Sequence, residues 1–264
     1  MKFGFIGTGV MAGAMLESAL AAGFLAKGDV LVYDKYHPEA AGRFGVASAG
    51  SAVEVAARCD IVQLGMKPQD LPSALEELEE LDEPLQARRP LVVSIAAGVP
   101  LKKIAVFAAK AVRLMPNINT TVGQGMTAYC ATQQVSQAQL AWVKGYCECF
   151  GRAVQLEEKH FSAFTALASS APAFVYLFID ELARAGVTAG LPKALALDIA
   201  TQTVFGSAAQ VRESALHPYE LIDRVCSPGG TTIAGINALR EHGFAHAVSQ
   251  ATLAAFARCH ELGK

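Results

Sequence analysis

Hydrophobic and polar positions follow two different patterns along this chain, and the change comes near residue 157. Before it, short continuous apolar runs alternate with longer stretches in which apolar residues recur at helical spacing. The runs, typical of strands in a parallel sheet covered by helices on both faces, predict strands at residues 2–6, 30–34, 61–66, 91–95, 111–115, 126–130 and 152–156. The stretches between them predict helices, among them residues 11–22, 52–58, 71–80 and 101–109. This alternation predicts a doubly wound α/β domain over residues 1–157.

The second part of the chain has helical patterns only. They cover residues 161–185, 193–214, 232–241 and 245–262, and breaks that contain Gly or Pro separate them. The change in pattern predicts a domain boundary after residue 157 and an all-helical domain over residues 158–264. A small helical domain rich in Ala and Leu cannot bury all its apolar faces alone, so we expect a homodimer interface there.

Composition narrows the class of protein. The 264 residues carry 22 Lys and Arg against 24 Asp and Glu, so no basic field favours nucleic acid. Hydrophobic residues make up 52% of the chain and charged residues 17%, which excludes a disordered protein. The uncharged, strongly apolar stretch over residues 161–179 contains Ser, Thr and Pro, so it favours a buried interface helix over a membrane span. The start of the chain has no signal-peptide pattern, and the six cysteines form no CxxC pair. We therefore expect a cytoplasmic protein with reduced thiols and no metal site.

A glycine-rich turn follows the first predicted strand and opens the first predicted helix. Its sequence is Gly7-Thr8-Gly9-Val10-Met11-Ala12, a GxGxxA motif in strand–turn–helix context. Gly7 permits the tight turn, Gly9 lets a pyrophosphate approach the backbone, and Ala12 lets helix and strand pack closely. The helix start adds partial positive charge. The motif predicts a Rossmann-like dinucleotide site, although the same glycines also occur in βα turns that bind nothing.

The second predicted strand ends in an acidic residue, Asp34. A carboxylate at this place accepts hydrogen bonds from the adenosine ribose hydroxyls and repels a 2′-phosphate, which favours NAD(H). Lys35 and His37 follow directly, however, and either could meet a 2′-phosphate. A solvated loop charge is the simpler alternative for Asp34, and the choice between NAD(H) and NADP(H) stays open.

Three later strands end in segments of small residues and prolines that could shape the backbone around a flat ring. Ligands of open α/β sheets bind at this edge. The candidate cofactor-binding residues there are Met66, Lys67, Pro68, Ala96, Ala97, Gly98, Met115, Pro116 and Asn117. Each segment alone is typical of an ordinary strand-end turn, and together they indicate one site.

The helical part contains one loop with candidate chemistry. Residues 225–232 place two glycines and several hydroxyls at a predicted helix start, where backbone N–H groups converge on a small anion such as a carboxylate. The candidate substrate-binding residues are Val225, Ser227, Gly229, Gly230, Thr231 and Thr232. An ordinary helix cap is the alternative.

These motifs, taken together and in order, resemble pyrroline-5-carboxylate reductases over nearly the whole chain. The most specific matches are Arg113-Leu114-Met115-Pro116-Asn117 and Ser227-Pro228-Gly229-Gly230-Thr231-Thr232. The resemblance implies NAD(P)H-dependent reduction of a cyclic imine, L-1-pyrroline-5-carboxylate, to L-proline, the last step of proline biosynthesis. It further implies a helical dimerisation domain and assembly of dimers into rings. It assigns the carboxylate to backbone groups of residues 229–231 and the ring nitrogen to the hydroxyl of Thr232, the one catalytic candidate.

Two departures from the family pattern concern the substrate. Ser169 and Ala171 stand where the family has glycines in Gly-Ser-Gly-Pro-Ala-Tyr, and Asn117-Ile118-Asn119 replaces Asn-Thr-Pro. An imine reductase for another cyclic imine, with Asp180 as a weak proton donor, is therefore one alternative. A non-catalytic dinucleotide sensor is another. A β-hydroxyacid dehydrogenase is disfavoured because it needs a lysine on the long helix, and residues 163–191 contain none.

Overall fold

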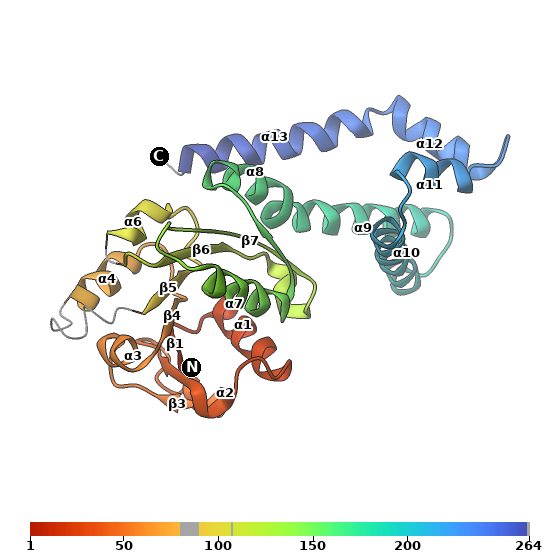
Figure 1. The fold of residues 1–264 in the computed structure, drawn as a ribbon. Helices are drawn as coiled ribbons and strands as arrows, with labels where there is room; N and C mark the ends of the chain where they lie inside the picture. The colour runs from red at the N-terminus through yellow and green to blue at the C-terminus, as the bar shows by residue number, and fades with distance from the viewer. Residues whose placement is uncertain (80–89, 107, 263–264) are drawn as a thin grey trace. The chain divides into compact units, whose positions relative to one another are not determined.

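An eight-stranded sheet in the order β3-β2-β1-β4-β5-β6-β7-β8 lies at the centre of the first part of the chain (Figure 1). The computed structural model describes residues 1–79, 90–106 and 108–262. Contacts divide them into a sheet unit, residues 1–169 with the last helix from Phe256 onward, and a helical unit, residues 170–255. The strands are β1 Phe3–Ile6, β2 Val30–Tyr33, β3 Ala47–Ser48, β4 Ile61–Leu64, β5 Leu91–Ser94, β6 Ala111–Met115, β7 Gly125–Ala131 and β8 Gly151–Gln155.

Every predicted strand is present, and the α/β class is confirmed, but the expectation of a parallel sheet is wrong for part of it. β7 pairs with β6 in antiparallel register, and β8 follows β7 in parallel. Between β6 and β7 the chain forms only the 3₁₀ turn Ile118–Val122. A crossover between parallel strands needs a dozen or so residues, so β7 can only return alongside its neighbour. The unpredicted β3 is two residues long, too short to leave a pattern.

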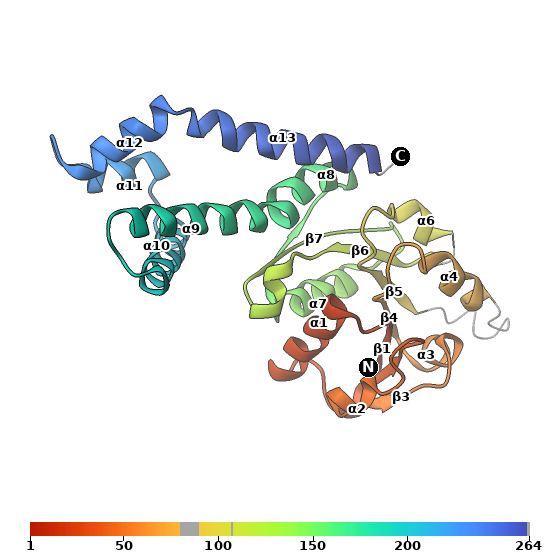
Figure 2. The same cartoon turned by 180° about the vertical axis from the view of Figure 1, so that it is seen from behind.

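Helices cover both faces of the sheet (Figure 2). One face packs against α1 Val10–Ala21, α2 Ala40–Phe44 and α7 Gln137–Glu148. The other packs against α3 Ala52–Arg58, α4 Leu71–Glu79 and α6 Leu101–Ala105. Successive strand residues point to opposite faces, so Phe5 joins the first cluster and Ile6 the second. Each continuous apolar strand therefore contributes side chains to the hydrophobic clusters on both faces of the sheet.

The predicted helices of this unit differ from the observed ones mainly at their ends. The helix predicted over residues 101–109 ends at Ala105, because the chain must turn into β6 at Ala111. The last predicted residue of 71–80, Glu80, lies outside the described residues. One buried polar pair links the sheet to α7: the Tyr146 hydroxyl donates to Gln63 Oε1 over 2.7 Å.

The segment predicted as one helix over residues 161–185 contains a π-helical turn, and that prediction needs correction. The observed elements are α8 Phe161–Phe164, the π turn Thr165–Ser170 and α9 Ala171–Thr188. Pro172 has no N–H with which to bond the carbonyl of Ala168 four residues earlier. Asn117 Nδ2 donates to that carbonyl instead, over 2.9 Å. The freed carbonyl and its new donor explain why the regular helix is interrupted here.

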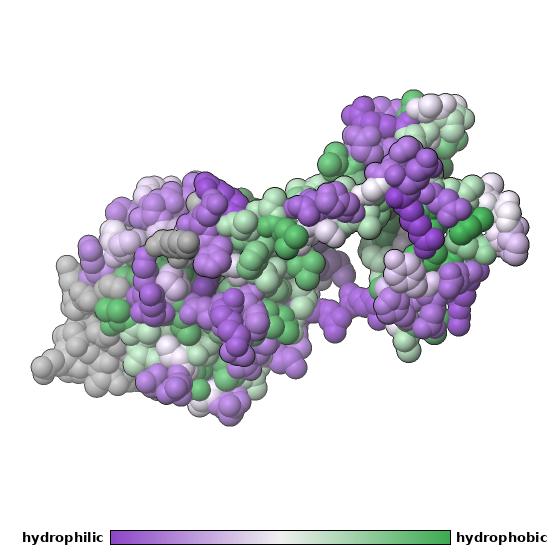
Figure 3. All heavy atoms as spheres, turned by 90° about the horizontal axis from the view of Figure 1, so that it is seen from above, coloured by the Kyte–Doolittle hydropathy of each residue, from purple (hydrophilic) through white to green (hydrophobic). Residues whose placement is uncertain are grey.

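The helical unit consists of helices alone. After α9 come α10 Lys193–Glu213, α11 Pro218–Val225, α12 Thr231–Glu241 and α13 Phe244–Leu262, of which α11 was not predicted. Only the part of α13 up to Ala255 belongs to this unit. Its buried apolar cluster is made of three alanines, Ala183, Ala196 and Ala200. Large apolar side chains instead reach the surface, among them Val175, Tyr176, Leu177, Leu195, Ile199 and Phe205. In Figure 3 hydrophobic residues stand out in green among hydrophilic ones.

One helical stretch, Glu158–Thr188, is long and apolar enough to cross a membrane by length and composition, with 11% of its most apolar window buried. The same composition suits a helix that packs against another protein surface. The predicted domain boundary after residue 157 stays a prediction. It follows the last strand, which ends at Gln155, whereas the compact units divide after Ser169.

Candidate functional site

The candidate cofactor residues lie at one edge of the sheet. Strands β2, β1, β4, β5 and β6 run parallel, so their carboxyl ends meet at the same edge. Each predicted segment directly follows one of these strands. The chain leaves β1 toward β2 on one side and later returns to β4 on the other, so the loops after β1 and β4 diverge. A switch of this kind is where open α/β sheets bind their ligands.

Tight backbone contacts determine the shape of the glycine-rich turn. Gly7 has φ +84° and donates its N–H to the carbonyl of Tyr33 over 2.8 Å. A Cβ at Gly7 would lie 3.1 Å from the Met66 nitrogen. A Cβ at Gly65 would lie 2.6 Å from that of Ala12. Gly7, Ala12 and Gly65 are therefore small because the chain's own packing requires it.

Gly9 differs from those residues. It precedes α1 with φ −57°, a value open to any residue. Apart from its two chain neighbours, no atom of the described residues lies within 4 Å of where its Cβ would be. The chain itself thus does not require glycine here, and the open space lies beside the first N–H groups of α1, which have no intrahelical partners. This cradle fits the pyrophosphate of a dinucleotide. Val10, the first residue of α1, is 78% exposed at the same place, and Met11 follows it.

Asp34 is buried, and its carboxylate is already engaged by the chain. Oδ2 accepts hydrogen bonds from the Thr8 N–H at 2.7 Å and the Thr8 hydroxyl at 2.8 Å. Oδ1 accepts from the N–H groups of Tyr36 and His37, each at 3.0 Å. Burial raises the pKa of Asp34, but the hydrogen bonds together lower it below the ordinary value. A carboxylate has about four acceptor positions, so the predicted bonds to ribose would have to displace these donors.

The remaining strand-end segments divide between exposed and buried residues. Met66 is half-buried after β4, whereas Lys67 and Pro68 are exposed. After β5, Ala96 is buried, and Ala97 and Gly98 are exposed, the latter with φ +74°. The exposed members are open to a ligand at the sheet edge. Their assignment to the cofactor stays a prediction.

The end of β6 is buried and tied to its neighbours. Met115, Pro116 and Asn117 are all buried. The Asn117 side chain uses both ends, because Nδ2 donates to the Ala168 carbonyl and Oδ1 accepts from the Met126 N–H at 3.0 Å. This amide therefore holds β6, β7 and the π turn together. A cofactor could meet the backbone here, but the Asn117 side chain is engaged within the chain.

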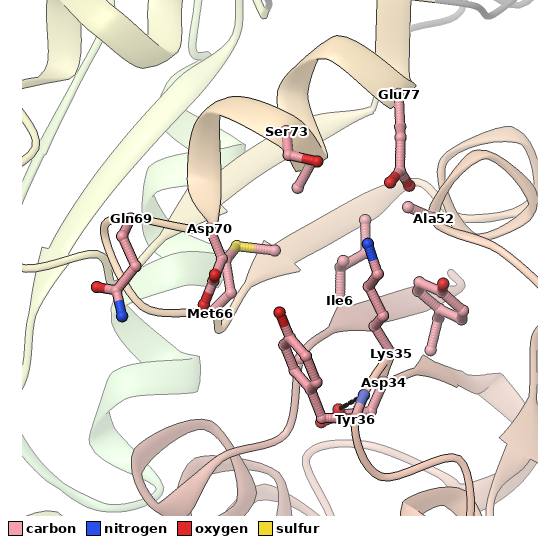
Figure 4. A pocket seen from close by; sticks show the side chains of 13 residues that line it. Ile6, Asp34, Lys35, Tyr36, Ala52, Met66, Gln69, Asp70, Ser73 and Glu77 are labelled. Atoms are coloured by element: carbon pink, nitrogen blue, oxygen red, sulfur yellow. Dashed lines mark hydrogen bonds between the residues drawn. The ribbon is translucent and has the colours of Figure 1, made fainter.

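Several residues beside the strand ends were not predicted. Tyr36, Asp70 and Glu77 line a cavity at this edge together with Lys35 and Met66 (Figure 4). A signal for the first existed in the sequence, because Asp at a strand end often accepts the backbone N–H two residues on, as Asp34 does from Tyr36. Asp70 directly precedes α4 and Glu77 lies within it, and no spacing in the sequence relates them to β2.

The candidate substrate residues form one loop of the helical unit. Gly230 donates its N–H to the Ser227 carbonyl over 3.0 Å, and Gly229 has φ +69°, a turn that requires glycine. α12 then begins at Thr231, so the first N–H groups of this helix lack intrahelical partners. Thr231, Thr232, Ser227 and Val225 are exposed. The loop thus presents amides and hydroxyls to solvent, an arrangement that can hold a carboxylate.

Comparisons with known proteins agree on both units. Residues 158–262 match the family model described as pyrroline-5-carboxylate reductase dimerisation, and residues 2–98 match the model described as NADP oxidoreductase, coenzyme F420-dependent. Pyrroline-5-carboxylate reductases from Synechocystis sp. and Escherichia coli are 40% and 38% identical to this chain, over 100% of it and over 99% and 98% of their own lengths. The crystal structure of Plasmodium falciparum pyrroline carboxylate reductase with NADP bound has a TM-score of 0.86 at 29% identity, and the match covers 100% of this chain and 98% of that one. The chain therefore belongs to the pyrroline-5-carboxylate reductase family.

Proposed function

We propose that this protein reduces L-1-pyrroline-5-carboxylate to L-proline with NADH or NADPH, as the last step of proline biosynthesis. One observation carries the proposal: the likeness to reductases spans both units, and each unit keeps a feature that the reaction needs. The sheet unit has the open space at Gly9 beside the start of α1. The helical unit has the exposed amides and hydroxyls at the start of α12.

The reaction demands positioning more than strong acid catalysis. When bound, the reduced nicotinamide supplies a hydride to the imine carbon, while the imine nitrogen keeps its proton and becomes an amine. A cyclic imine can take that proton from water, which fits a loop that offers hydroxyls and amides. Backbone groups of Gly229, Gly230 and Thr231 would hold the substrate carboxylate. Holding the imine carbon in place removes much of the entropic cost of the reaction.

Thr232 is the residue we propose for the ring nitrogen. It lies in the first turn of α12, and its side chain is exposed. Its hydroxyl would therefore lie beside the amides proposed for the carboxylate. A hydroxyl can donate to or accept from the substrate and can also orient a water. Thr232 thus meets both requirements: its hydroxyl is a weak hydrogen-bond donor, and it lies next to the amides proposed for the substrate carboxylate.

The assembled form we propose is a homodimer, or a ring of dimers, formed through residues 158–264. The exposed apolar side chains of α9 and α10 and the matching dimerisation model support this. We place the protein in the cytoplasm because its six cysteines are all free, as in a reducing compartment. The partners we expect are the cyclic imino acid and further copies of the chain, without nucleic acid or membrane.

A second candidate is reduction of a different cyclic imine. The Ser169 hydroxyl is buried and has no hydrogen-bond partner among the described residues. An unpaired buried hydroxyl within the π turn is a group that a substrate with an extra polar atom could satisfy. This observation favours a changed substrate over a lost activity.

The test is turnover of pyrroline-5-carboxylate by the full chain, with NADH and NADPH in parallel and the six-membered analogue piperideine-carboxylate as the competitor. We expect the higher kcat/KM for the five-membered imine. A preference for the six-membered imine would support the second candidate. Dinucleotide binding without turnover of either imine would contradict both and support a dinucleotide sensor.

A further inference from the structure

A cavity of about 140 Å³ lies at the carboxyl ends of β1, β2 and β4 (Figure 4). Lys35 and Tyr36 enter it from the segment after β2, and they face Asp70, directly before α4, and Glu77 within that helix. In a dinucleotide-binding sheet, the residue at the end of the second strand faces the adenosine ribose. This cavity is therefore where a 2′-hydroxyl or a 2′-phosphate would be distinguished.

The carboxylate of Asp34 provides a negative charge at this cavity from within the chain. Its Oδ1 accepts hydrogen bonds from the N–H groups of Tyr36 and His37. Successive backbone N–H groups in a turn are the donors that commonly bind phosphate oxygens. Here a carboxylate already occupies both. A 2′-phosphate would have to displace Asp34 to use them.

Displacement would also disturb the glycine-rich turn. The other carboxylate oxygen, Oδ2, holds the N–H and the hydroxyl of Thr8, which lies between Gly7 and Gly9. The Asp34 side chain therefore stabilises the glycine-rich turn through Thr8 and also occupies the N–H groups of Tyr36 and His37 after β2. Rotating it toward solvent would break hydrogen bonds at both places.

The charge of the cavity opposes a phosphate as well. Its lining includes the carboxylates of Asp34, Asp70 and Glu77 and, as the one cation among the described lining residues, Lys35. The formal balance is two negative charges. Hydrogen bonding keeps the pKa of Asp34 below its ordinary value, so this carboxylate stays ionised at neutral pH. Like charges at this range repel.

We propose, on the basis of the proposed function, that this enzyme selects NADH over NADPH and that Asp34 is the specificity-determining residue. It acts as an internal anion that occupies the amides of Tyr36 and His37, which a 2′-phosphate would otherwise bind. The 2′-hydroxyl of NADH carries no charge and leaves these hydrogen bonds intact. Lys35 alone does not offset the carboxylates that surround it.

The test is equilibrium binding to the full chain, followed by nicotinamide fluorescence, with NADH and NADPH titrated separately. The wild-type protein should bind NADH at least about tenfold more tightly than NADPH, since charged hydrogen bonds contribute on this scale. Asp34→Ser opens the two amides and removes the charge, so it should lower the Kd for NADPH relative to that for NADH by about tenfold or more. Asp34→Asn keeps an acceptor for the amides and removes only the charge, so its shift should be smaller.

Asp70→Asn is the matched control, because Asp70 lines the same cavity and takes no part in the hydrogen bonds that hold Asp34. It should change the NADH-to-NADPH ratio less than either substitution at Asp34. Binding of NADPH by the wild type as tight as its binding of NADH would overturn the proposal. If Asp34→Ser does not fold, an unchanged ratio of the NADH and NADPH dissociation constants in Asp34→Asn would overturn it as well. Binding of neither dinucleotide would instead contradict the proposed function itself, so the two failures are distinguishable.

Discussion

The sheet unit and the helical unit solve the burial of apolar surface in opposite ways. In the sheet unit, phenylalanines such as Phe3 and Phe5 are fully buried between sheet and helices. In the helical unit, the buried apolar cluster holds only alanines, while Leu177 is 62% exposed and Phe205 63% exposed. Exposed apolar area of this kind marks a surface that another protein covers. The sheet unit thus obtains its core from its own residues, whereas for the helical unit we propose that a second copy covers the exposed apolar side chains.

The largest expected effect comes from placing charge on the exposed apolar helices. The wild-type chain, 27.7 kDa as a monomer, should have at least twice that mass in light scattering. Leu177→Asp combined with Phe205→Asp should leave a monomer or an aggregate, because a buried unpaired carboxylate costs several kcal/mol. Val106→Asp is the control, since Val106 is 73% exposed but belongs to the sheet unit. It should leave the mass unchanged, and a native wild-type monomer at micromolar concentration would contradict the comparison.

The second effect tests the sheet unit alone. Gly9→Val places a branched side chain in the open space beside α1, so the dinucleotide Kd should rise by about a hundredfold or more, the equivalent of about 2.7 kcal/mol. The melting temperature should stay close to that of the wild type, because no described atom of the chain lies where the new Cβ would be.

Gly28→Val is the matched change, since a Cβ there also meets no described atom within 4 Å. Gly28 lies before β2, at the amino end of that strand, so cofactor affinity should stay unchanged. Unaltered dinucleotide affinity in a folded Gly9→Val protein, measured by calorimetry, would show that the pyrophosphate binds elsewhere.

The third effect tests the proposed substrate loop of the helical unit and leaves the exposed apolar side chains of that unit unchanged. Thr232→Ala should lower kcat/KM by roughly 10- to 150-fold, because a hydrogen bond to a charged partner contributes about 1.5–3 kcal/mol. Dinucleotide affinity should not change, and Thr232→Ser should retain most activity. If Thr232 only stabilises the start of α12, Thr232→Ala loses about 1 kcal/mol of folding stability and melts at a lower temperature. Its kcat/KM then stays within about threefold of the wild-type value.

The smallest effect sharpens the picture of a self-contained sheet unit. Tyr146→Phe removes the hydroxyl that donates to Gln63 Oε1, and both residues are fully buried. The unpaired amide oxygen should lower the free energy of unfolding by about 1–3 kcal/mol. Denaturant unfolding measures this, and the dinucleotide Kd should remain that of the wild type. An unchanged midpoint would mean that water reaches Gln63.

Much of the sheet unit could be predicted from local signals. Continuous apolar runs located its strands, and the GxGxxA turn fell where the sheet edge places it. The antiparallel return of β7 could not be read from its own residues, because direction depends on the length of the preceding link. The π turn likewise depends on a side chain 51 residues away, Asn117, which takes the carbonyl that Pro172 leaves free.

The candidate site shows the same limit. Sequence position marked Asp34 correctly as the residue at the end of the second strand. It could not show that four donors of the chain already hold its carboxylate, because two come from Thr8 on another strand end. For the helical unit the sequence predicted apolar faces that the unit cannot bury alone, but not the exposed fraction of the side chains on them. Only burial in three dimensions shows that alanines alone form the buried cluster.

The most direct measurement is the stoichiometry of the reaction: proline formed per nicotinamide oxidised when the full chain is given L-1-pyrroline-5-carboxylate. Proline is quantified by chromatography and nicotinamide by absorbance in the same sample, and Gly9→Val serves as the blank. We expect one proline for each nicotinamide oxidised with the wild type, and far less of both products in the same time with the variant, whose dinucleotide binding is weakened. Nicotinamide that stays reduced, or that is oxidised without proline, would contradict the assignment of this chain as a pyrroline-5-carboxylate reductase.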